Sequence, residues 1–579
     1  MKDTREFIRG MDISSFLEME DKGYQYYDYE RNPVDLLQFA KQEGFNYVRL
    51  RIWNEPWLIE ESGGYCDLEK TLQMAKIIKK YGYGFFLDFH YSDWWADPGH
   101  QKKPKAWEHL NDTELKEAVY LYTKEVLCTL KNAGTVPDMV QIGNEIRTGM
   151  LFPEGAVKNW TGLAGLINSG IRAVRDTLSR EETKVVIHLD QGGRYVYYKE
   201  WFDAAIENGV EDFDIIALSY YPFWHGTFYE FKNTMENLVK EYGKDLLVAE
   251  TAHAFQRSNG TFFGEAQEHA AGFFATPKNQ RKVLELIESI IANVSEKKGM
   301  GFFYWEPFMR MPKDMEGWGS CMALVDENGV ATEGLRAISY HEFEKNKDKI
   351  AKVYVPLEIE IATREHLHKM GELLPKVKAL KMDGTLMKKE IMWQSALEEE
   401  DGIYEVSGVV EGYEEIVKVK AVLKEIRDRQ QNFLNNASFE KGMQDWEVNV
   451  TKGNDCLEIN IGKEKVQEVG VLEQNVFFFR AEEICEWILK TKSQPLKKGS
   501  YQLSCRYKGD NTTGVEIHLF AKTKEKTYLT QIFPQDEEWM LYQITNIQVQ
   551  EKELLEVGIK VSAPPVYGKV IQFCLTPNF

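Results

Sequence analysis

The stretch Gln141-Ile142-Gly143-Asn144-Glu145 decides how the rest of this sequence is interpreted. A turn at residues 135–138 precedes it, and the run from Met139 to Ile142 is short and mostly apolar, which is typical of a strand buried on both faces. Glu145 therefore comes just past the C-terminal end of a buried strand. In a parallel α/β barrel, catalytic residues gather at that end, each carried by a different strand.

A second carboxylate follows the same pattern further along the chain. Residues 244–251 contain a turn, an apolar strand and then Glu250. A single acid after a strand is often a helix N-cap or a surface residue, and for either glutamate alone we would prefer that explanation. Glu145 and Glu250 lie about three βα units apart, at ~35 residues each, which places them on strands four and seven of a barrel. Two carboxylates on one barrel face could flank a glycosidic bond.

Length, charge and cysteine content limit the protein class. A chain of 579 residues is expected to hold more than one domain. Its net charge of −20 argues against nucleic acid or an anionic membrane as the main partner. Seven scattered cysteines without C-x-x-C spacing indicate buried thiols rather than a disulfide framework or a zinc site. The N-terminus has no apolar segment and no run is long enough to span a bilayer, so we expect a cytoplasmic protein, or an extracellular or cell-surface one if a signal peptide has been removed.

Strand-like and helical segments alternate through the first part of the chain. The β-rich segments are residues 7–14, 47–53, 85–90, 139–142, 184–190, 215–224, 245–250 and 301–307. Apolar residues at helical spacing lie between them, for example in residues 34–41 and 68–81. Eight such units predict a closed (β/α)8 TIM barrel over residues 1–345.

Charged and aromatic residues mark the ends of two of these strands. Arg49 and Arg51 share one face of the second strand, and arginines facing a barrel interior are costly unless acids pair with them. Asp88 and His90 share a face of the third strand. The loop that follows contains Asp93, Trp94, Trp95 and Asp97. Aromatic rings stack on sugar C–H surfaces and carboxylates accept hydroxyl protons, so we interpret this loop as a sugar platform.

Six segments together resemble the arabinogalactan endo-β-1,4-galactanases of glycoside hydrolase family 53. They are Gly10-Met11-Asp12-Ile13-Ser14-Ser15, Val48-Arg49-Leu50-Arg51-Ile52-Trp53, residues 88–98, Ile142-Gly143-Asn144-Glu145-Ile146-Arg147, Ser219-Tyr220-Tyr221-Pro222-Phe223 and Tyr304-Trp305-Glu306-Pro307. The resemblance covers the whole barrel region. It implies endo-hydrolysis of galactan or type I arabinogalactan, the side chains of pectin, by a retaining mechanism with Glu145 as acid/base and Glu250 as nucleophile.

The resemblance also implies supporting roles. Arg49 would hold the nucleophile ionised, Asn144 would meet the sugar 2-hydroxyl, and Tyr221 would hydrogen-bond the nucleophile. His90 and Trp305 would line the subsite where the bond breaks. No metal or organic cofactor is required for this chemistry. Residues 251–280 form a shorter segment than the calcium-binding insertion of bacterial family members. This counts against a structural calcium ion, although such an ion stays possible.

A retaining hydrolase needs one ionised and one protonated carboxyl group ~5 to 5.5 Å apart. We expect Arg49 to lower the pKa of Glu250, and we expect aromatic packing and the charged nucleophile to raise the pKa of Glu145. The loop at residues 311–323 differs from the family, so the resemblance gives no preference for substrate length.

The second half of the chain reads as β-structure. Residues 345–352 form a charged connector, and four segments with period-two alternation follow, with Asp383-Gly384 as a hairpin turn. We interpret residues 346–428 as an immunoglobulin-like β-sandwich spacer. Residues 429–579 resemble a β-jelly-roll carbohydrate-binding module. Its aromatic residues Trp446, Trp487, Tyr507 and Trp539 are either a binding platform or core.

Two alternatives to the galactanase interpretation remain. The first is another retaining β-glycanase of the same clan, a mannanase or xylanase, against which the loop at residues 94–98 argues. The second is a non-catalytic galactan-binding protein on a decayed barrel. Intact Glu145, Glu250, Arg49 and Asn144 argue against decay, because a dead enzyme usually loses one of them.

Overall fold

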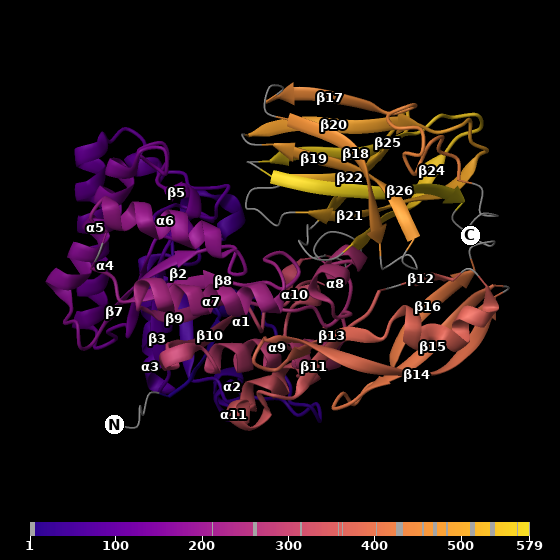
Figure 1. Cartoon of the computed structure of the whole chain (residues 1–579). Helices are drawn as coiled ribbons and strands as arrows, with labels where there is room; N and C mark the ends of the chain where they lie inside the picture. The colour runs from indigo at the N-terminus through magenta and orange to yellow at the C-terminus, as the bar shows by residue number, and fades with distance from the viewer. Residues whose placement is uncertain are drawn as a thin grey trace. The chain divides into compact units, whose positions relative to one another are not determined.

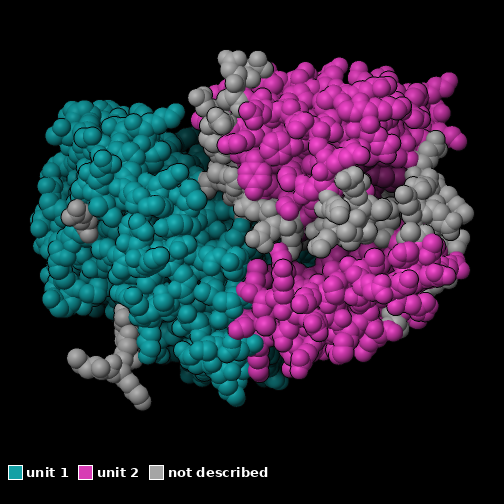
Figure 2. Space-filling view, viewed as in Figure 1, with its two compact units in different colours: residues 1–348, 382–385 teal, residues 349–381, 386–579 magenta. Residues whose placement is uncertain are grey.

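The structure is a computed structural model of the chain. It describes residues 6–577 except 211, 259–262, 313–314, 316, 357, 362, 401, 424–431, 454–456, 467–471, 482–483, 510–515, 533–538 and 564–565. The chain divides into two compact units (Figure 2). One comprises residues 1–348 and 382–385, and the other comprises residues 349–381 and 386–579.

The first unit is built on a closed barrel of eight parallel strands in the order β1-β10-β9-β8-β7-β4-β3-β2 (Figure 1). The strands are β1 (Ile8–Asp12), β2 (Tyr47–Ile52), β3 (Gly84–Phe89), β4 (Met139–Ile142), β7 (Lys184–Leu189), β8 (Ile215–Ser219), β9 (Asp245–Thr251) and β10 (Gly299–Trp305). A two-stranded ribbon, β5 (Gly149–Met150) and β6 (Gly155–Ala156), lies in the loop after β4. The predicted TIM barrel is confirmed, with each strand within a few residues of its predicted place.

Helices connect the barrel strands. The connecting helices are α1 (Phe16–Asp21), α2 (Leu36–Glu43), α3 (Leu68–Lys80), α4 (Asp112–Asn132), α5 (Trp160–Thr177), α6 (Tyr195–Glu207), α7 (Phe228–Tyr242), α8 (Glu265–Ala271) and α9 (Pro277–Ala292). Two short helices, α10 (Trp318–Cys321) and α11 (Phe343–Asn346), follow the last barrel strand. Several begin at side chains that accept a backbone N–H, such as Asp35 before α2 and Asp67 before α3. Asn111 and Glu114 form a reciprocal capping box at the start of α4.

Apolar side chains close the inside of the barrel. A buried cluster is contributed mainly by the N-terminal and middle positions of the strands: Ile8, Phe86, Met139, Val186, Ile215, Ala217, Leu247, Ala249 and Phe303. Polar and charged interior residues come mainly from the C-terminal positions of the same strands, for example Asp12, Asp88 and Glu250. The barrel is therefore a packed core with a polar end, as expected where active sites form in this fold.

Residues 350–423 form a six-stranded sheet in the order β11-β13-β14-β15-β16-β12. The elements are β11 (Ile350–Tyr354), β12 (Glu358–Ile361), α12 (Met370–Leu373), β13 (Lys376–Lys381), β14 (Leu386–Glu400), β15 (Ile403–Val410) and β16 (Val417–Leu423). The long strand β14 pairs with β13 through residues 386–390 and with β15 through residues 391–400, so it joins two parts of the sheet. The predicted hairpin turn at Asp383-Gly384 connects β13 to β14, with Gly384 at φ 81°.

Two details of this region correct the sequence interpretation. The charged stretch 345–352, taken as a solvated connector, instead holds the end of α11 and the start of β11. Strand β14, the longest of the described strands, was not among the predicted segments, because lysine and glutamate side chains interrupt its alternation. The predicted boundary at residues 428–429 lies outside the described residues.

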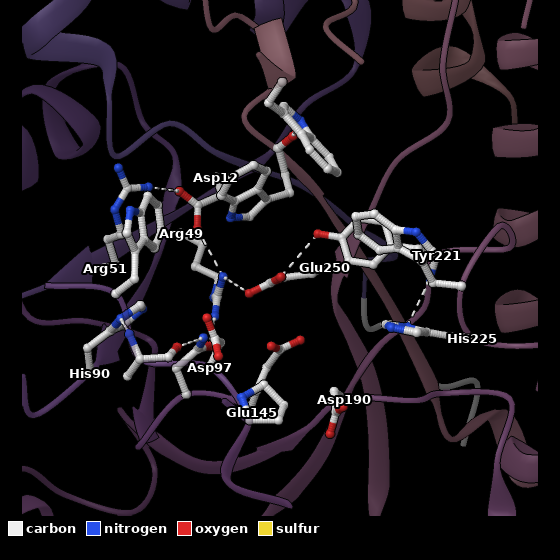
Figure 3. A pocket seen from close by; sticks show the side chains of 17 residues that line it. Asp12, Arg49, Arg51, His90, Asp97, Glu145, Asp190, Tyr221, His225 and Glu250 are labelled. Carbon is white, nitrogen blue, oxygen red and sulfur yellow. Dashed lines mark hydrogen bonds and ion pairs between the residues drawn. The ribbon is translucent and has the colours of Figure 1, made fainter. Parts of the chain in front are cut away.

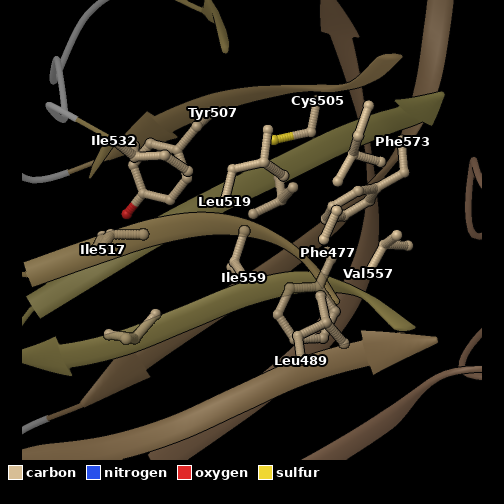
Figure 4. Packing of buried hydrophobic residues seen from close by; sticks show 14 of the residues in the cluster. Phe477, Leu489, Cys505, Tyr507, Ile517, Leu519, Ile532, Val557, Ile559 and Phe573 are labelled. Atoms are coloured by element: carbon tan, nitrogen blue, oxygen red, sulfur yellow. The ribbon is translucent and has the colours of Figure 1, made fainter. Parts of the chain in front are cut away.

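Residues 447–577 form two five-stranded sheets. One has the order β17-β20-β25-β22-β23 and the other has the order β18-β19-β26-β21-β24. The strands are β17 (Glu447–Lys452), β18 (Leu457–Val466), β19 (Leu472–Ala481), β20 (Cys485–Lys492), β21 (Gly499–Gly509), β22 (Glu516–Lys522), β23 (Thr527–Ile532), β24 (Met540–Val549), β25 (Glu556–Ala563) and β26 (Val566–Pro577). Alternate residues of both sheets meet in one apolar core (Figure 4).

None of the aromatic residues left open as platform or core is exposed: Trp446, Trp487 and Tyr507 lie in the core between the sheets, and Trp539 packs in a separate cluster with Val476 and Ile571. Trp487 and Tyr507 are fully buried, and Trp446 and Trp539 are only 5 % exposed. The described cysteines are free thiols: Cys66, Cys128, Cys321, Cys485, Cys505 and Cys574. In the described part of the chain, every helix is too short or too polar to cross a membrane.

Candidate active site

A cavity of about 390 Å³ opens at the C-terminal end of the barrel (Figure 3). Eight of the eleven site residues named from the sequence line it: Arg49, His90, Trp95, Asn144, Glu145, Tyr221, Glu250 and Trp305. They come from six different barrel strands or the loops after them. The barrel thus brings together side chains that are up to 256 positions apart in the sequence, as the strand-end positions predicted.

The backbone turns sharply where it delivers Glu145. Gly143 has φ 77°, and Glu145 itself has φ 48° and ψ 48°, a left-handed conformation that is uncommon for a residue with a side chain. Tyr91 after β3, Gln191 after β7 and Glu306 after β10 also have positive φ. Uncommon backbone conformations of this kind are frequent at functional sites, where contacts with the surrounding structure hold them in place.

Glu250 is held from both sides of its carboxylate. Arg49 Nη1 lies 3.0 Å from Oε1, and the Tyr221 hydroxyl donates to Oε2 at 3.1 Å. Arg49 also pairs with Asp12 at 3.0 Å and with Asp88 at 2.8 Å. One guanidinium therefore serves three buried carboxylates.

Two opposing effects set the pKa of Glu250, and only that of Arg49 was expected from the sequence. Burial raises the pKa of Glu250 to about 7, because desolvation of the carboxylate outweighs the lowering effect of Arg49. Asp12 and Asp88 raise it further, and the Tyr221 hydrogen bond lowers it. Arg49 thus lowers the pKa of Glu250, as expected, but its effect is smaller than that of desolvation.

Glu145 lies in the same part of the cavity as Glu250 (Figure 3). Ser219 Oγ is its hydrogen-bonding neighbour, 2.5 Å from Oε1. Burial raises the pKa of Glu145 well above its usual range, and the carboxylates of Glu250, Asp190 and Asp97 raise it further. Glu145 is therefore the protonated member of the pair at a pH where Glu250 is ionised, as expected.

Asn144 is fixed by contacts on both ends of its amide. Its Oδ1 accepts from Arg49 Nη2 at 3.0 Å and from Gln141 Nε2 at 3.1 Å, and its Nδ2 donates to the Ala96 carbonyl at 2.8 Å. Because Arg49 only donates, the oxygen and nitrogen positions of the amide are determined. One Asn144 N–H is left for a ligand hydroxyl.

His90 is fixed in one tautomer in the same way. Its Nδ1 accepts the backbone N–H of Ala96 at 3.0 Å and the indole N–H of Trp53 at 3.3 Å. The proton is therefore on Nε2, which lies 3.1 Å from Asp88 Oδ2 and donates to it.

Aromatic rings form one wall of the cavity. The centroids of Trp305 and Trp318 are 4.6 Å apart, and those of Trp95 and Trp305 are 5.8 Å apart. The Tyr221 ring lies 5.6 Å from that of Trp318, and the Arg51 guanidinium lies 4.2 Å from the Trp95 ring centroid. Flat apolar faces beside carboxylates suit a pyranose ring.

Three residues named from the sequence do not line the cavity. Asp88 is fully buried and bonded to Arg49, Gln141 and His90. Asp93 accepts the backbone N–H groups of residues 55 and 105, so its carboxylate stabilises the loop instead of facing a sugar. Trp94 packs on the buried Trp53, with centroids 4.6 Å apart. The platform is thus made by Trp95 and by tryptophans from other loops.

The cavity has further lining residues. Arg51 and Asp97 were noted in the sequence without an assigned role, and the others were not selected: Asp12, Ala96, Pro98, Asp190, Trp224, His225 and Trp318. Asp12 and Asp190 end barrel strands or directly follow them, a position that could have indicated them. Asp190 is paired with Arg147, whose Nε lies 2.7 Å from Oδ1. Trp318 comes from the loop at residues 311–323, and no local pattern pointed to it.

Metal-binding side chains do not cluster in the described residues: no group of three or more His, Cys, Asp or Glu is placed to hold an ion there. Part of the segment considered for calcium, residues 259–262, lies outside the described residues.

Comparison with known proteins gives matches over the barrel. A family profile described as Glycosyl hydrolase family 53 matches residues 8–338. An uncharacterised protein of Niallia circulans is 44 % identical over 350 residues, which cover 57 % of this chain and 93 % of that one. An endo-beta-1,4-galactanase of Bacillus subtilis strain 168 is 35 % identical over 312 residues, covering 52 % of this chain and 70 % of that one. The GH53 catalytic domain of Ignisphaera aggregans superposes with a TM-score of 0.54 and 40 % identity, covering 57 % of this chain and 95 % of that one.

Proposed function

This chain belongs to glycosyl hydrolase family 53, and we propose that its cavity hydrolyses β-1,4-galactosidic bonds within galactan chains with Glu250 as nucleophile and Glu145 as acid/base. The chain is a retaining endo-β-1,4-galactanase by family and by its galactanase relatives. The reaction of the family needs no cofactor. The assignment of roles to residues rests on the geometry of the cavity.

One observation carries the assignment: the two carboxyl groups that share the cavity have opposite surroundings. Glu250 is bonded to a guanidinium and a phenol, which both favour its ionised form. Glu145 faces the carboxylates of Glu250, Asp190 and Asp97, which favour its protonated form. An ionised and a protonated carboxyl group side by side are the two groups that a retaining glycosidase requires.

In the first step, a Glu250 oxygen attacks the anomeric carbon and the glycosidic C–O bond breaks. Glu145 gives its proton to the departing oxygen, so the leaving sugar departs as a neutral alcohol. The sugar is then held by an ester bond to Glu250. Since Glu250 no longer carries a negative charge, the pKa of Glu145 falls, and its carboxylate is suited to take a proton from water.

In the second step, water attacks the anomeric carbon while Glu145 removes its proton, and the ester bond to Glu250 breaks. The configuration is retained because the carbon is inverted twice. We assign the second N–H of the Asn144 amide to the sugar 2-hydroxyl and the faces of Trp95 and Trp305 to the sugar ring; the fixed orientation of the amide and the packing of the two indoles support this. Galactan chains, including those of type I arabinogalactan, are the substrate we propose.

The first test is product analysis after incubation with linear β-1,4-galactan, with galactomannan and xylan as controls. We expect short galactose oligomers from galactan only. Release of sugars from mannan or xylan at a comparable rate would assign the chain to another β-glycanase activity. Binding to galactan without cleavage would favour the non-catalytic alternative.

Replacing the nucleophile tests its role directly. Glu250→Gln should lower turnover on galactan by about a thousandfold or more, because the glycosyl–enzyme ester cannot form. Calorimetric binding of a galacto-oligosaccharide should change little, since the amide keeps the shape of the side chain. Substantial turnover in this variant would show that another group is the nucleophile.

Rescue by azide tests the acid/base role of Glu145. Glu145→Ala should retain activity on a substrate with a good leaving group, and added azide should accelerate that reaction by forming a galactosyl azide. An inactive variant that azide does not rescue would contradict the role of Glu145.

A further inference from the structure

Gln141 lies inside the barrel, next to the turn that delivers Asn144 and Glu145. It is the third residue of β4 and shares the inner face of that strand with Met139, since side chains alternate along a strand. Its side chain is fully buried. Gln141 is not among the residues that line the cavity, so any part it has in the reaction passes through its neighbours.

The orientation of the Gln141 amide follows from one contact. Its Oε1 accepts from Arg49 Nη2 at 3.2 Å, and a guanidinium only donates, so the amide oxygen must face Arg49. The Nε2 group is thereby placed against three acceptors: Asp88 Oδ1 at 2.6 Å, the Gly143 carbonyl at 3.0 Å and Asn144 Oδ1 at 3.1 Å. An amide nitrogen has two hydrogens, so two of these three contacts share one hydrogen.

Gln141 differs from the other groups that contact the Asn144 side chain. Arg49 Nη2 and His188 Nδ1 each lie 3.0 Å from Asn144 Oδ1. Gln141 Nε2 meets the same oxygen and also the backbone carbonyl of the preceding residue, which belongs to the turn. Gln141 therefore couples the direction of the Asn144 side chain to the conformation of the turn.

We propose that Gln141 is a positioning residue for recognition of the sugar 2-hydroxyl: it holds the Asn144 oxygen against the turn and so directs the second Asn144 N–H at that hydroxyl. The first Asn144 N–H donates to the Ala96 carbonyl at 2.8 Å, which anchors the amide at its other end. Three donors on one amide oxygen also polarise the amide, which strengthens its N–H groups as donors. This inference rests on the proposed function, which assigns Asn144 to the 2-hydroxyl.

Loss of the Gln141 amide should act on the transition state. Hydrogen bonds to the 2-hydroxyl strengthen as the oxocarbenium-like transition state forms, and both steps of the reaction pass through such a state. A contact made mainly in the transition state lowers kcat when it is lost and leaves KM nearly unchanged. Gln141 should therefore influence kcat, and mainly for sugars that carry a 2-hydroxyl.

A substrate without the 2-hydroxyl makes the test specific. The two substrates are 2,4-dinitrophenyl β-1,4-galactobioside and its analogue that lacks the 2-hydroxyl on the sugar next to the aryl group. Gln141→Met keeps the length of the side chain without its polar atoms. In this variant, kcat on the normal substrate should fall by about tenfold, as loss of one hydrogen bond implies. On the 2-deoxy analogue kcat should fall by less than about threefold, and KM should change by less than about threefold on either substrate.

The ratio of the two kcat values, which we call the 2-hydroxyl preference, gives the outcome. Equal losses on both substrates would show that Gln141 supports the barrel in general and would overturn the inference, as would native rates on both. Asn144→Ala should remove the 2-hydroxyl preference, and adding Gln141→Met to it should reduce the preference no further. A further loss of preference in the double variant would show that Gln141 does not act through Asn144.

Gln141→Glu separates hydrogen bonding from packing. It keeps the shape of the side chain and an oxygen for Arg49, but it cannot supply two N–H hydrogens. Its 2-hydroxyl preference should therefore fall as in Gln141→Met, and a native preference would assign the effect to packing and refute the proposal. Thermal unfolding verifies that each variant is folded. If Gln141→Met does not fold, Gln141→Glu decides by the same criterion.

Thr183→Val is the matched control near the other end of β4. It removes a fully buried hydroxyl that donates to the Pro137 carbonyl at 2.7 Å, just before the strand begins. The 2-hydroxyl preference should stay native in this variant. A preference that falls as in Gln141→Met would show that any lost hydrogen bond near β4 has this effect, and the inference would be wrong.

Failure of this inference is distinguishable from failure of the proposed function. If the native protein cleaves the galactobioside and Asn144→Ala loses the 2-hydroxyl preference, then a native preference in Gln141→Met refutes only the role of Gln141. If the native protein cleaves neither galactan nor the galactobioside, the proposed function is wrong. If Asn144→Ala keeps the preference, the assignment of Asn144 is wrong. In both of these cases the inference falls as well.

Discussion

At the scale of single residues, the site packs more acids than bases into a desolvated space. Asp12, Asp88 and Glu250 surround Arg49, while Glu306 pairs with Arg51 at 2.7 Å. Burying a charge is costly unless it is paired, so a surplus of carboxylates is expected to take up protons. This explains why burial raises the pKa of Glu306, like that of Glu250, to about 7. The buried acids of the barrel are therefore accommodated in two ways: by pairing with arginine and by raised pKa values.

The activity should depend on pH in a bell shape. The reaction needs Glu250 ionised, and the pKa of Glu250 is about 7, so kcat/KM should rise with pH through that value. It also needs Glu145 protonated, and the pKa of Glu145 lies well above its usual range, so activity should fall again at higher pH. Initial rates on galactotetraose across pH check this; an acidic limb near pH 4 would contradict it.

Tyr221→Phe should move the acidic limb. The phenol donates to the Glu250 carboxylate and so stabilises its ionised form, which means that its removal raises the pKa of Glu250. A bond of about 1.5 kcal/mol corresponds to a shift of about one pH unit toward higher pH.

Tyr220→Phe is the matched control for this shift. The Tyr220 hydroxyl bonds the Gly226 carbonyl at 3.1 Å, and its loss should leave the acidic limb in place. Equal shifts in both variants would show that the limb does not report Glu250.

At the scale of elements, strand β4 is bounded by two glycines in left-handed conformations with different surroundings. Gly134, before the strand, has φ 73°, and a Cβ there would meet no atom within 4 Å. Gly143, after the strand, has φ 77°, and a Cβ there would lie 2.6 Å from Ile146 Cγ2. The turn that delivers Glu145 thus combines a left-handed backbone with tight packing.

Gly143→Ala should therefore damage both stability and catalysis. We expect the free energy of unfolding to fall by about 2 kcal/mol or more and kcat to fall at least about tenfold, because relief of the clash moves Asn144 and Glu145. In Gly134→Ala, only the left-handed backbone disfavours alanine, so the free energy of unfolding should fall by about 1 kcal/mol and kcat should stay native. Urea unfolding and initial rates compare the pair. Native kcat in Gly143→Ala would mean that the turn tolerates the side chain without moving Glu145.

At the scale of the whole molecule, the chain has separate cores in its two units. The barrel closes around its own apolar cluster, and the sandwich closes around the cluster that contains Trp487. The Trp487 ring lies 4.6 Å from that of Phe479 and is 1 % exposed. Units with separate cores are expected to unfold in separate steps.

Trp487→Ala should therefore destabilise the second unit by about 3 kcal/mol or more and leave the barrel intact. Calorimetry should show one transition at lower temperature and the other unchanged, with native rates on galactotetraose below both transitions. Leu529→Ala, at a side chain that is 58 % exposed on β23, should change neither transition by more than about 0.5 kcal/mol. A single cooperative transition that moves as a whole would show that the units unfold together.

The sequence by itself determined the barrel and the residues at the ends of its strands. Apolar runs, helical spacing and strand-end acids are local patterns, so Glu145, Glu250 and Arg49 could be identified from the sequence alone. The tertiary structure decided which strand-end residues face the cavity: it placed Asp190 there and turned Asp93 to the loop backbone. It also decided the burial of the sandwich tryptophans, the pairing of β14 and the raised pKa of Glu250. The reason is physical: solvation, side-chain direction and the sharing of one cation depend on atoms that are distant in sequence.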